Sequence, residues 1–151
     1  GGKIYCLGKS RWIFLSLERK RPARIPREYG EMYNVQDRTA FEYSFKEDSI
    51  PGNLEHKKEF EVRRGDIDTN SHVNNARYID WMLEALPENI YNNYHMKSLE
   101  VTYKKETSGG SIASCCSDCV KNAPEEWTGF HRITDLQGNE LSTASTVWKK
   151  I

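Results

Sequence analysis

Ten consecutive residues, DIDTNSHVNN at positions 66–75, concentrate side chains that could do chemistry. They include two carboxylates, two hydroxyls, three amides and the imidazole of His72. An imidazole beside a carboxylate can accept a proton or polarise a water molecule, and nearby amides can orient a carbonyl oxygen. The stretch is therefore a candidate for general acid–base chemistry.

Two other interpretations of this stretch need weighing. Asp, Asn and Ser also form turns and cap helices, so Asn70, Ser71 or Asn74 could serve only that purpose. A calcium loop of the EF-hand type matches at its first three ligand positions, but it requires Gly where Ser71 stands and Glu where Arg77 stands. The calcium interpretation fails on both counts, whereas helix capping stays open.

A second polar cluster lies at Glu106 and Thr107, in the segment KKETSGG. A carboxylate at a strand end could face a cleft, although such a run is also typical of a solvated strand end. The chain has no GxSxG motif, and its cysteines lie far from His72 in sequence. No nucleophile is therefore evident next to His72.

The polar stretch precedes one strongly periodic helix, predicted from about residue 74 to residue 86. Pro87 is expected to end it, because proline removes a donor and clashes with the preceding turn, and a short second helical turn is expected at 87–94. Arg77, Asp80 and Glu84 mark the polar side. The predicted apolar stripe comprises Ala76, Ile79, Leu83 and Leu86, widened by Tyr78 and Met82.

Alternating apolar and polar residues predict about five antiparallel strands around this helix. Phe60 and Val62 share one face of the first strand, and Leu99, Val101 and Tyr103 share one face of the second. Turns are expected at 109–110 and 138–139. The strands are expected within 57–65, 95–106, 111–121, 127–135 and 140–150. One helix against such a sheet makes an α+β domain.

Composition excludes several classes of protein. The 151 residues carry 22 basic and 22 acidic side chains, so there is no charge excess typical of nucleic-acid binding, and no apolar run is long enough for a membrane span. The four cysteines do not provide a second pair of zinc ligands, so we expect reduced structural thiols and no metal site. These cysteines are Cys6, Cys115, Cys116 and Cys119.

Three segments together resemble the acyl-acyl-carrier-protein thioesterases. DIDTNSHVNNARYIDWMLEALP (66–87) is similar to the family's signature around its central helix, VTYKKE (101–106) to a strand ending in Glu, and SRWIFLSLERKRPARIP (10–26) to the end of its first domain. The resemblance implies two hotdog folds in one chain. Residues 1–26 would be the last hairpin of a truncated N-terminal hotdog, 27–55 the connection, and 56–151 the C-terminal hotdog with the active site.

A weak internal repeat fits this arrangement. Gly2 precedes Trp12 by ten residues, as Gly138 precedes Trp148, and each pair frames a strand-like run. Because the chain opens without Met, we expect a fragment of a longer protein. An incomplete hotdog would leave an open sheet edge, which favours pairing with a second copy in a homodimer.

The resemblance also implies roles for individual residues. Asp68, Asn70 and His72 match the family's active-site loop, and Glu106 matches its downstream acid. Many relatives carry Cys where this chain has Thr107, and a threonine without its own base is a poor nucleophile. We therefore expect direct attack by water, with Glu106 as general base and His72 orienting the water.

The remaining parts of the expected mechanism lie at the helix start. Backbone N–H groups near Val73 and Asn74, together with Asn70, would stabilise the oxyanion, helped by the helix dipole. Asp68 would fix the side chain of His72 or Asn70. No cofactor or metal is expected, because a thiolate leaves readily without one.

The expected substrate is an acyl carrier protein bearing a fatty acyl thioester, in a cytoplasmic, bacterial-type setting of fatty acid biosynthesis. A hotdog acyl-CoA thioesterase and a non-catalytic acyl-binding module are the alternatives. Because the carrier is acidic, its docking patch should be basic. Candidates are Arg63, Arg64, Lys104, Lys105, Lys149 and Lys150.

Overall fold

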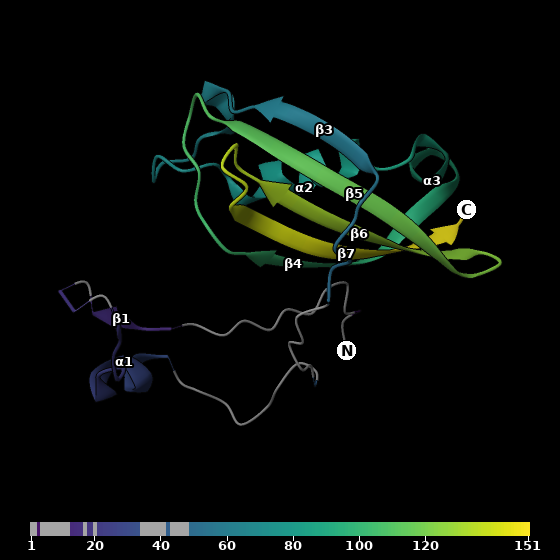
Figure 1. Ribbon diagram of the computed structural model, residues 1–151. Coiled ribbons are helices and arrows are strands. Elements are labelled where there is room, and N and C mark those ends of the chain that lie inside the picture. The colour runs from purple at the N-terminus through teal and green to yellow at the C-terminus, as the bar shows by residue number, and fades with distance from the viewer. Residues whose placement is uncertain (1–2, 4–12, 17, 20, 34–41, 43–48) are drawn as a thin grey trace. The chain divides into compact units, whose positions relative to one another are not determined.

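The computed structural model describes residues 3, 13–16, 18–19, 21–33, 42 and 49–151 (Figure 1). The chain forms two compact units, residues 1–46 and 47–151. In the first, β1 (Leu15–Ser16) pairs antiparallel with β2 (Arg21–Pro22), and α1 (Arg27–Met32) follows. Gly2, Cys6 and Trp12 lie outside the described residues, so the predicted repeat stays a prediction.

The second unit contains one five-stranded antiparallel sheet, as predicted. Its spatial order is β3-β5-β6-β7-β4, which leaves β3 and β4 at the edges. The predicted turns are confirmed, with Gly110 and Gly138 at φ values of 77° and 82° that favour glycine. The strands are β3 (His56–Glu61), β4 (Tyr94–Tyr103), β5 (Ile112–Ala123), β6 (Glu126–Thr134) and β7 (Glu140–Lys150).

The central helix, α2 (Asn75–Glu84), lies across one face of this sheet (Figure 1). It buries Tyr78, Trp81 and Met82 against Cys115, Ile133 and Ala144 of the strands and against Val62, which directly follows β3. The α+β architecture predicted from the sequence is therefore confirmed.

The predicted apolar stripe is confirmed for Tyr78, Met82 and Leu86, which are buried, but it was wrong for its other members. Ala76 is exposed and Ile79 and Leu83 are only half-buried, whereas Trp81, which the prediction left out, is 5% exposed. Its ring stacks on Phe60 with the centroids 5.7 Å apart. Because a large aromatic side chain buries more area than Ala or Ile, Trp81 turns its own side of the helix toward the sheet.

The helix also ends earlier than predicted. Ala85 is its C-cap, and Pro87 is the N-cap of α3 (Glu88–Asn93), the expected short second helix. A proline disfavours helical backbone at the residue before it, which explains why α2 stops short of Leu86.

A band of hydrogen-bonded polar side chains crosses the buried face of the sheet. His131 is fully buried, with Nδ1 2.8 Å from Ser117 Oγ and Nε2 3.0 Å from Thr146 Oγ1. The indole N–H of Trp148 donates to the same Thr146 oxygen at 2.8 Å. Burial lowers the pKa of His131 to about 4, so its ring is neutral at pH 7.

Candidate active site

The segment between Ile67 and Val73 is a closed loop in front of α2. Ile67 and Val73 form an isolated antiparallel bridge, and the Asp68 N–H donates to the His72 carbonyl at 2.8 Å. Ser71 has a φ of 65°, a left-handed conformation that is uncommon for a residue with a Cβ. The loop therefore presents Asn70 and His72 from a tight, locally strained turn.

The Asp68 carboxylate stabilises this turn by accepting backbone hydrogen bonds within it. Its Oδ1 accepts the backbone N–H of Asn70 at 2.8 Å and that of His72 at 3.3 Å. The expectation that Asp68 fixes the side chain of His72 or Asn70 was therefore wrong. It positions both residues through their backbone, as short acidic side chains do in turns.

The decisive contact of the site joins two segments far apart in sequence. His72 Nε2 lies 3.2 Å from Glu106 Oε2, with the side chains 43% and 73% exposed. Both line a cleft of about 490 Å³ at the start of α2, together with Asp68 and Asn70. The structure thus brings together the four residues that the resemblance proposed as catalytic, in an arrangement suited to moving a proton to and from a water molecule.

Thr107 is placed differently. Its hydroxyl lies 3.0 Å from Ser111 Oγ, and Thr107 is absent from the residues that line the cleft. Its backbone carbonyl accepts the Val73 N–H at 3.0 Å. The Thr107 side chain is therefore engaged within its own loop, with Ser111, and not with His72.

The expected oxyanion donors need correction. The Val73 N–H is taken by Thr107, and the Asn74 N–H donates to the Asp66 carbonyl at 2.8 Å. Neither group is open to a ligand. Asn74 instead caps α2, because its Oδ1 accepts the Ala76 N–H at 2.9 Å.

Another backbone donor is better placed at the same helix end. Asn75 is the first residue of α2, where the N–H has no intrahelical acceptor, and it lines the cleft. The Asn70 side chain lines the cleft as well. The Asn75 N–H is therefore the candidate donor in place of the Val73 and Asn74 N–H groups, and Asn70 stays as predicted.

Sequence reasoning missed two tyrosines of the cleft, Tyr78 and Tyr103. Their rings meet edge to face at 5.7 Å, and the Tyr103 hydroxyl donates to the Asn75 carbonyl at 3.1 Å. The apolar periodicity marked both as core residues, and only the tertiary structure shows that they also border the cleft.

The six basic docking candidates do not line one common cavity. Lys104 and Lys105 border the cleft and contact Glu140 and Asp135, at 2.9 and 3.3 Å. Hydrogen bonds from Asn139, and secondarily Lys105, lower the pKa of Asp135. Arg63 contacts the buried Asp66 at 3.4 Å.

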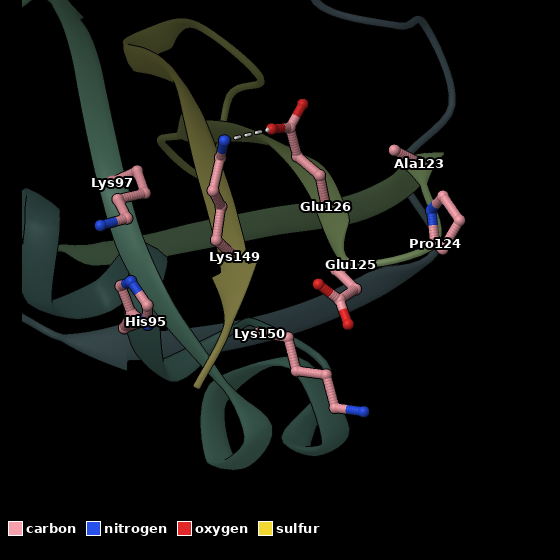
Figure 2. A pocket seen from close by; sticks show the side chains of 8 residues that line it. All are labelled: His95, Lys97, Ala123, Pro124, Glu125, Glu126, Lys149 and Lys150. Atoms are coloured by element: carbon pink, nitrogen blue, oxygen red, sulfur yellow. Dashed lines mark ion pairs between the residues drawn. The ribbon is translucent and has the colours of Figure 1, made fainter.

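Lys149 and Lys150 lie at the opposite end of the sheet. They border a separate cavity of about 580 Å³ with His95 and Lys97 (Figure 2). Lys149 contacts Glu126 there at 3.1 Å. Opposite charges accompany the lysines at both ends, so neither cavity is lined by basic side chains alone.

The cysteines whose thiols the structure describes, Cys115, Cys116 and Cys119, are free. Burial raises the pKa of the Cys115 and Cys119 thiols to about 12. Within the described residues, no three side chains that could ligate a metal lie together. No helix in that part of the chain is long and apolar enough to cross a membrane.

Comparison with known proteins finds acyl-carrier-protein thioesterases and hydrolases, both as a family and as individual relatives. The family described as "Acyl-ACP thioesterase C-terminal domain" matches residues 51–150. The dodecanoyl-[acyl-carrier-protein] hydrolase of Cinnamomum camphora is 31% identical over 88 residues, which are 58% of this chain and 23% of that protein. Oleoyl-acyl carrier protein thioesterase 2 of Arabidopsis thaliana is 28% identical over 156 residues, 96% of this chain and 40% of that protein. Both relatives are named chloroplastic.

The same fold occurs in a solved structure, the 12:0-ACP thioesterase from Umbellularia californica. The TM-score is 0.73 at 23% identity, over 91% of this chain and 52% of that one. The hotdog fold predicted from the sequence is thereby confirmed. The chain spans less than half the length of each of these two curated relatives.

Proposed function

The chain belongs to the acyl-ACP thioesterase family, and from this membership we propose that it supplies the catalytic half of an enzyme that hydrolyses fatty acyl thioesters of acyl carrier protein. The observation that carries the proposal is the 3.2 Å contact between His72 and Glu106 in the cleft at the start of α2. A polar loop that served only to cap the helix would need Asn74 and would not need this pair.

In the proposed reaction a water molecule attacks the thioester carbonyl carbon. Glu106 accepts a proton from this water, and His72 orients the water or shares the proton. The carbonyl oxygen becomes an oxyanion, for which the Asn75 N–H and the Asn70 side chain are the proposed donors. The C–S bond then breaks, the thiolate of the carrier takes the proton, and a free fatty acid remains.

Water is the proposed nucleophile, because Thr107 is poorly placed for attack. Its hydroxyl contacts Ser111, and it lies outside the set of cleft-lining residues. The hydroxyl also lacks a base of its own, which a threonine nucleophile requires. We further propose that no metal or organic cofactor takes part.

The proposed domain arrangement has residues 1–26 as the end of a first hotdog, 27–55 as the connection and 56–151 as the second hotdog. In the first unit, the described side chains of Ile13, Leu15 and Met32 are 66%, 54% and 77% exposed. A two-stranded hairpin is marginally stable alone, so these apolar groups are expected to be covered by further strands. We propose a homodimer as the arrangement that would cover an open edge of the sheet.

The finer expectations on partner and location are proposals too. Lys104 and Lys105 flank the cleft and are the proposed docking residues nearest the reaction, whereas Lys149 and Lys150 would contact a different part of the carrier. We propose a cytoplasmic location in a bacterial-type cell. The free cysteines fit a compartment that keeps thiols reduced.

The test is thiol release by the full-length parent protein from a series of acyl-carrier-protein thioesters and the matching acyl-CoAs. We expect the carrier-bound series to be hydrolysed, with a loss of at least about a hundredfold in Glu106→Gln and in His72→Ala. Glu88→Gln, an exposed carboxylate on α3, is the matched control and should keep full activity.

Other results would refute parts of the proposal. Preference for acyl-CoA would assign a different thioester substrate. Binding of the acyl carrier protein without hydrolysis by the wild type would identify a binding module. A Glu106→Gln protein with the wild-type rate would remove the general base.

A further inference from the structure

One tyrosine of the cleft forms a hydrogen bond that has no part in the proposed chemistry. Tyr103 is the last residue of β4, and its hydroxyl donates to the backbone carbonyl of Asn75 at 3.1 Å. Asn75 is the first residue of α2 and carries the candidate N–H donor for the oxyanion. The bond therefore joins the end of a strand to the residue at the helix start that the proposed reaction requires.

The ring of Tyr103 is itself restricted by packing. It meets Tyr78 edge to face, with the centroids 5.7 Å apart and an interplanar angle of 78°, a geometry that aromatic pairs favour. Tyr78 is 2% exposed and packs in turn against Trp81, with the centroids 5.4 Å apart. The backbone of Tyr103 pairs with Ser142 of β7. The Tyr103 hydroxyl therefore approaches Asn75 from a fixed support.

The Asn75 carbonyl can accept this bond and stay within the helix. A backbone carbonyl has two lone pairs, and in a helix one of them accepts the N–H four residues further along the chain. The second lone pair is available to a side chain. The N–H of the same residue has no intrahelical acceptor at this position of the helix. A donor to the carbonyl therefore holds Asn75 and leaves its N–H open.

A second hydrogen bond crosses between the same two segments. The Val73 N–H donates to the Thr107 carbonyl at 3.0 Å. Val73 directly follows His72, and Thr107 directly follows Glu106. The tyrosine bond lies on the other side of both catalytic candidates, three residues before Glu106 on one segment and three residues after His72 on the other. The two hydrogen bonds therefore bracket the pair.

Such attachments matter because the pair itself is exposed. The side chains of His72 and Glu106 are 43% and 73% exposed, and an ion pair between exposed side chains contributes little to holding its own geometry. A displacement of about 1 Å between reacting groups can cost about a hundredfold in rate. The relative position of the two segments therefore depends on the hydrogen bonds that join their backbones.

We propose that Tyr103 is a positioning residue for hydrolysis, whose hydroxyl holds the Asn75 carbonyl and so keeps the oxyanion donor in place relative to Glu106. This inference rests on the proposed thioesterase function. In this role Tyr103 donates to the protein backbone and does not touch the reacting atoms.

The variant that tests the inference is Tyr103→Phe in the full-length protein, which removes the donor and keeps the ring against Tyr78. We expect kcat to fall about ten- to a hundredfold, because a displaced oxyanion donor stabilises the transition state less. KM should change less than about twofold, because the contacts of the bound substrate before the reaction stay the same.

The hydrogen bond also has a signature that is independent of activity. A carbonyl carbon resonates at lower field when its oxygen accepts a hydrogen bond, so the 13C signal of the Asn75 carbonyl should move upfield in Tyr103→Phe. In protein labelled with 13C-carbonyl asparagine and 15N-alanine, this carbon is observed through the N–H of Ala76, the next residue. The signal is assigned by its disappearance in Ala76→Ser.

Two matched controls separate positioning from lost stability. Ser142→Ala also removes a hydroxyl that donates to a backbone carbonyl, that of Thr102 at 3.1 Å, but this bond lies between two strands and does not reach the helix. It should lower the melting temperature and keep the wild-type kcat. Tyr91→Phe makes the same chemical change as the test variant at an exposed position on α3, away from the cleft, and should keep both.

Four results would overturn the inference. The first is wild-type kcat in Tyr103→Phe, and the second is an equal loss of kcat in Ser142→Ala. The third is a raised KM with unchanged kcat, which would assign the Tyr103 hydroxyl to substrate binding. The fourth is an unchanged Asn75 carbonyl signal, which would refute the contact itself. A wild-type protein that hydrolyses no thioester would instead refute the proposed function, and the positioning role with it.

Discussion

Acidification from pH 7 to pH 4 should destabilise the C-terminal unit through one buried side chain, His131. The ring is fully buried, and both of its nitrogens have hydroxyl partners, Ser117 and Thr146. The Thr146 hydroxyl accepts the Trp148 N–H at 2.8 Å and can donate to the Gly129 carbonyl at 3.4 Å. Protonation of His131 would place a positive charge in this fully buried site, where desolvation disfavours it.

The magnitude follows from the two protonation equilibria. The imidazole has an ordinary pKa of 6.5, and in the folded protein burial lowers the pKa of His131 to about 4. Between pH 6.5 and about 4, the unfolded chain therefore binds a proton at His131 that the folded chain does not bind. Stability from this residue is complete above pH 6.5 and is lost as the pH falls toward 4. At about 1.4 kcal/mol per pH unit, the total loss is about 3 kcal/mol, a large part of a typical domain's stability.

The assay is urea unfolding of the full-length protein at pH values from 7 to 4.5, with the NMR titration of the His131 ring in parallel. The unfolding free energy should fall most steeply below pH 6.5, by up to about 1.4 kcal/mol per pH unit for one proton. His131→Gln is the matched variant. Its unfolding free energy should depend less steeply on pH below 6.5, because the variant lacks the titrating ring. The reasoning is refuted if the wild type and the variant have the same slope, or if His131 titrates near 6.5.

Three further predictions concern local geometry. Gly129→Ala should lower stability by about 1–3 kcal/mol in urea unfolding, because a Cβ there would lie 2.5 Å from Thr146 Oγ1; an unchanged midpoint would contradict this close approach. Ser71→Val should reduce both stability and thioester hydrolysis, whereas Ser71→Gly retains them, since only the branched side chain resists a φ of 65°; equal behaviour of the two variants would argue against a strained turn. In native protein at pH 8, iodoacetamide should modify the half-buried Cys116 before the fully buried Cys115, whose pKa is raised to about 12, as tandem mass spectrometry of the shared peptide can show; the reverse order would be inconsistent with this burial.

Local patterns were sufficient for the elements of the second unit. Alternation located its five strands, and glycines at positions 110 and 138 marked two of its turns. The same reasoning found Tyr78 and Met82 on the buried side of α2 but missed Trp81 there, because periodicity counts apolar residues without weighing their size. Burial of Trp81 removes more apolar area from water than burial of Ala76 would, and its ring stacks on Phe60 of β3.

The sequence alone also determined which residues are chemically capable, namely His72, Asn70 and Asp68 in one loop and Glu106 in a distant one. Residue types and their spacing carry that information, because imidazoles, amides and carboxylates have the same chemistry wherever they stand. The family resemblance then linked the two segments, and the structure placed His72 and Glu106 3.2 Å apart.

Only the tertiary structure decided how these residues can act. Hydrogen bonds from Val73 to Thr107 and from Asn74 to Asp66 occupy two N–H groups that looked available, and the contact with Ser111 engages the Thr107 hydroxyl. Val73 and Thr107 are 34 residues apart, whereas Asp66 lies eight residues from Asn74, and Ser111 lies four residues from Thr107 in the same loop. A backbone donor is open or occupied according to what folds against it, and a sequence pattern does not record that neighbour.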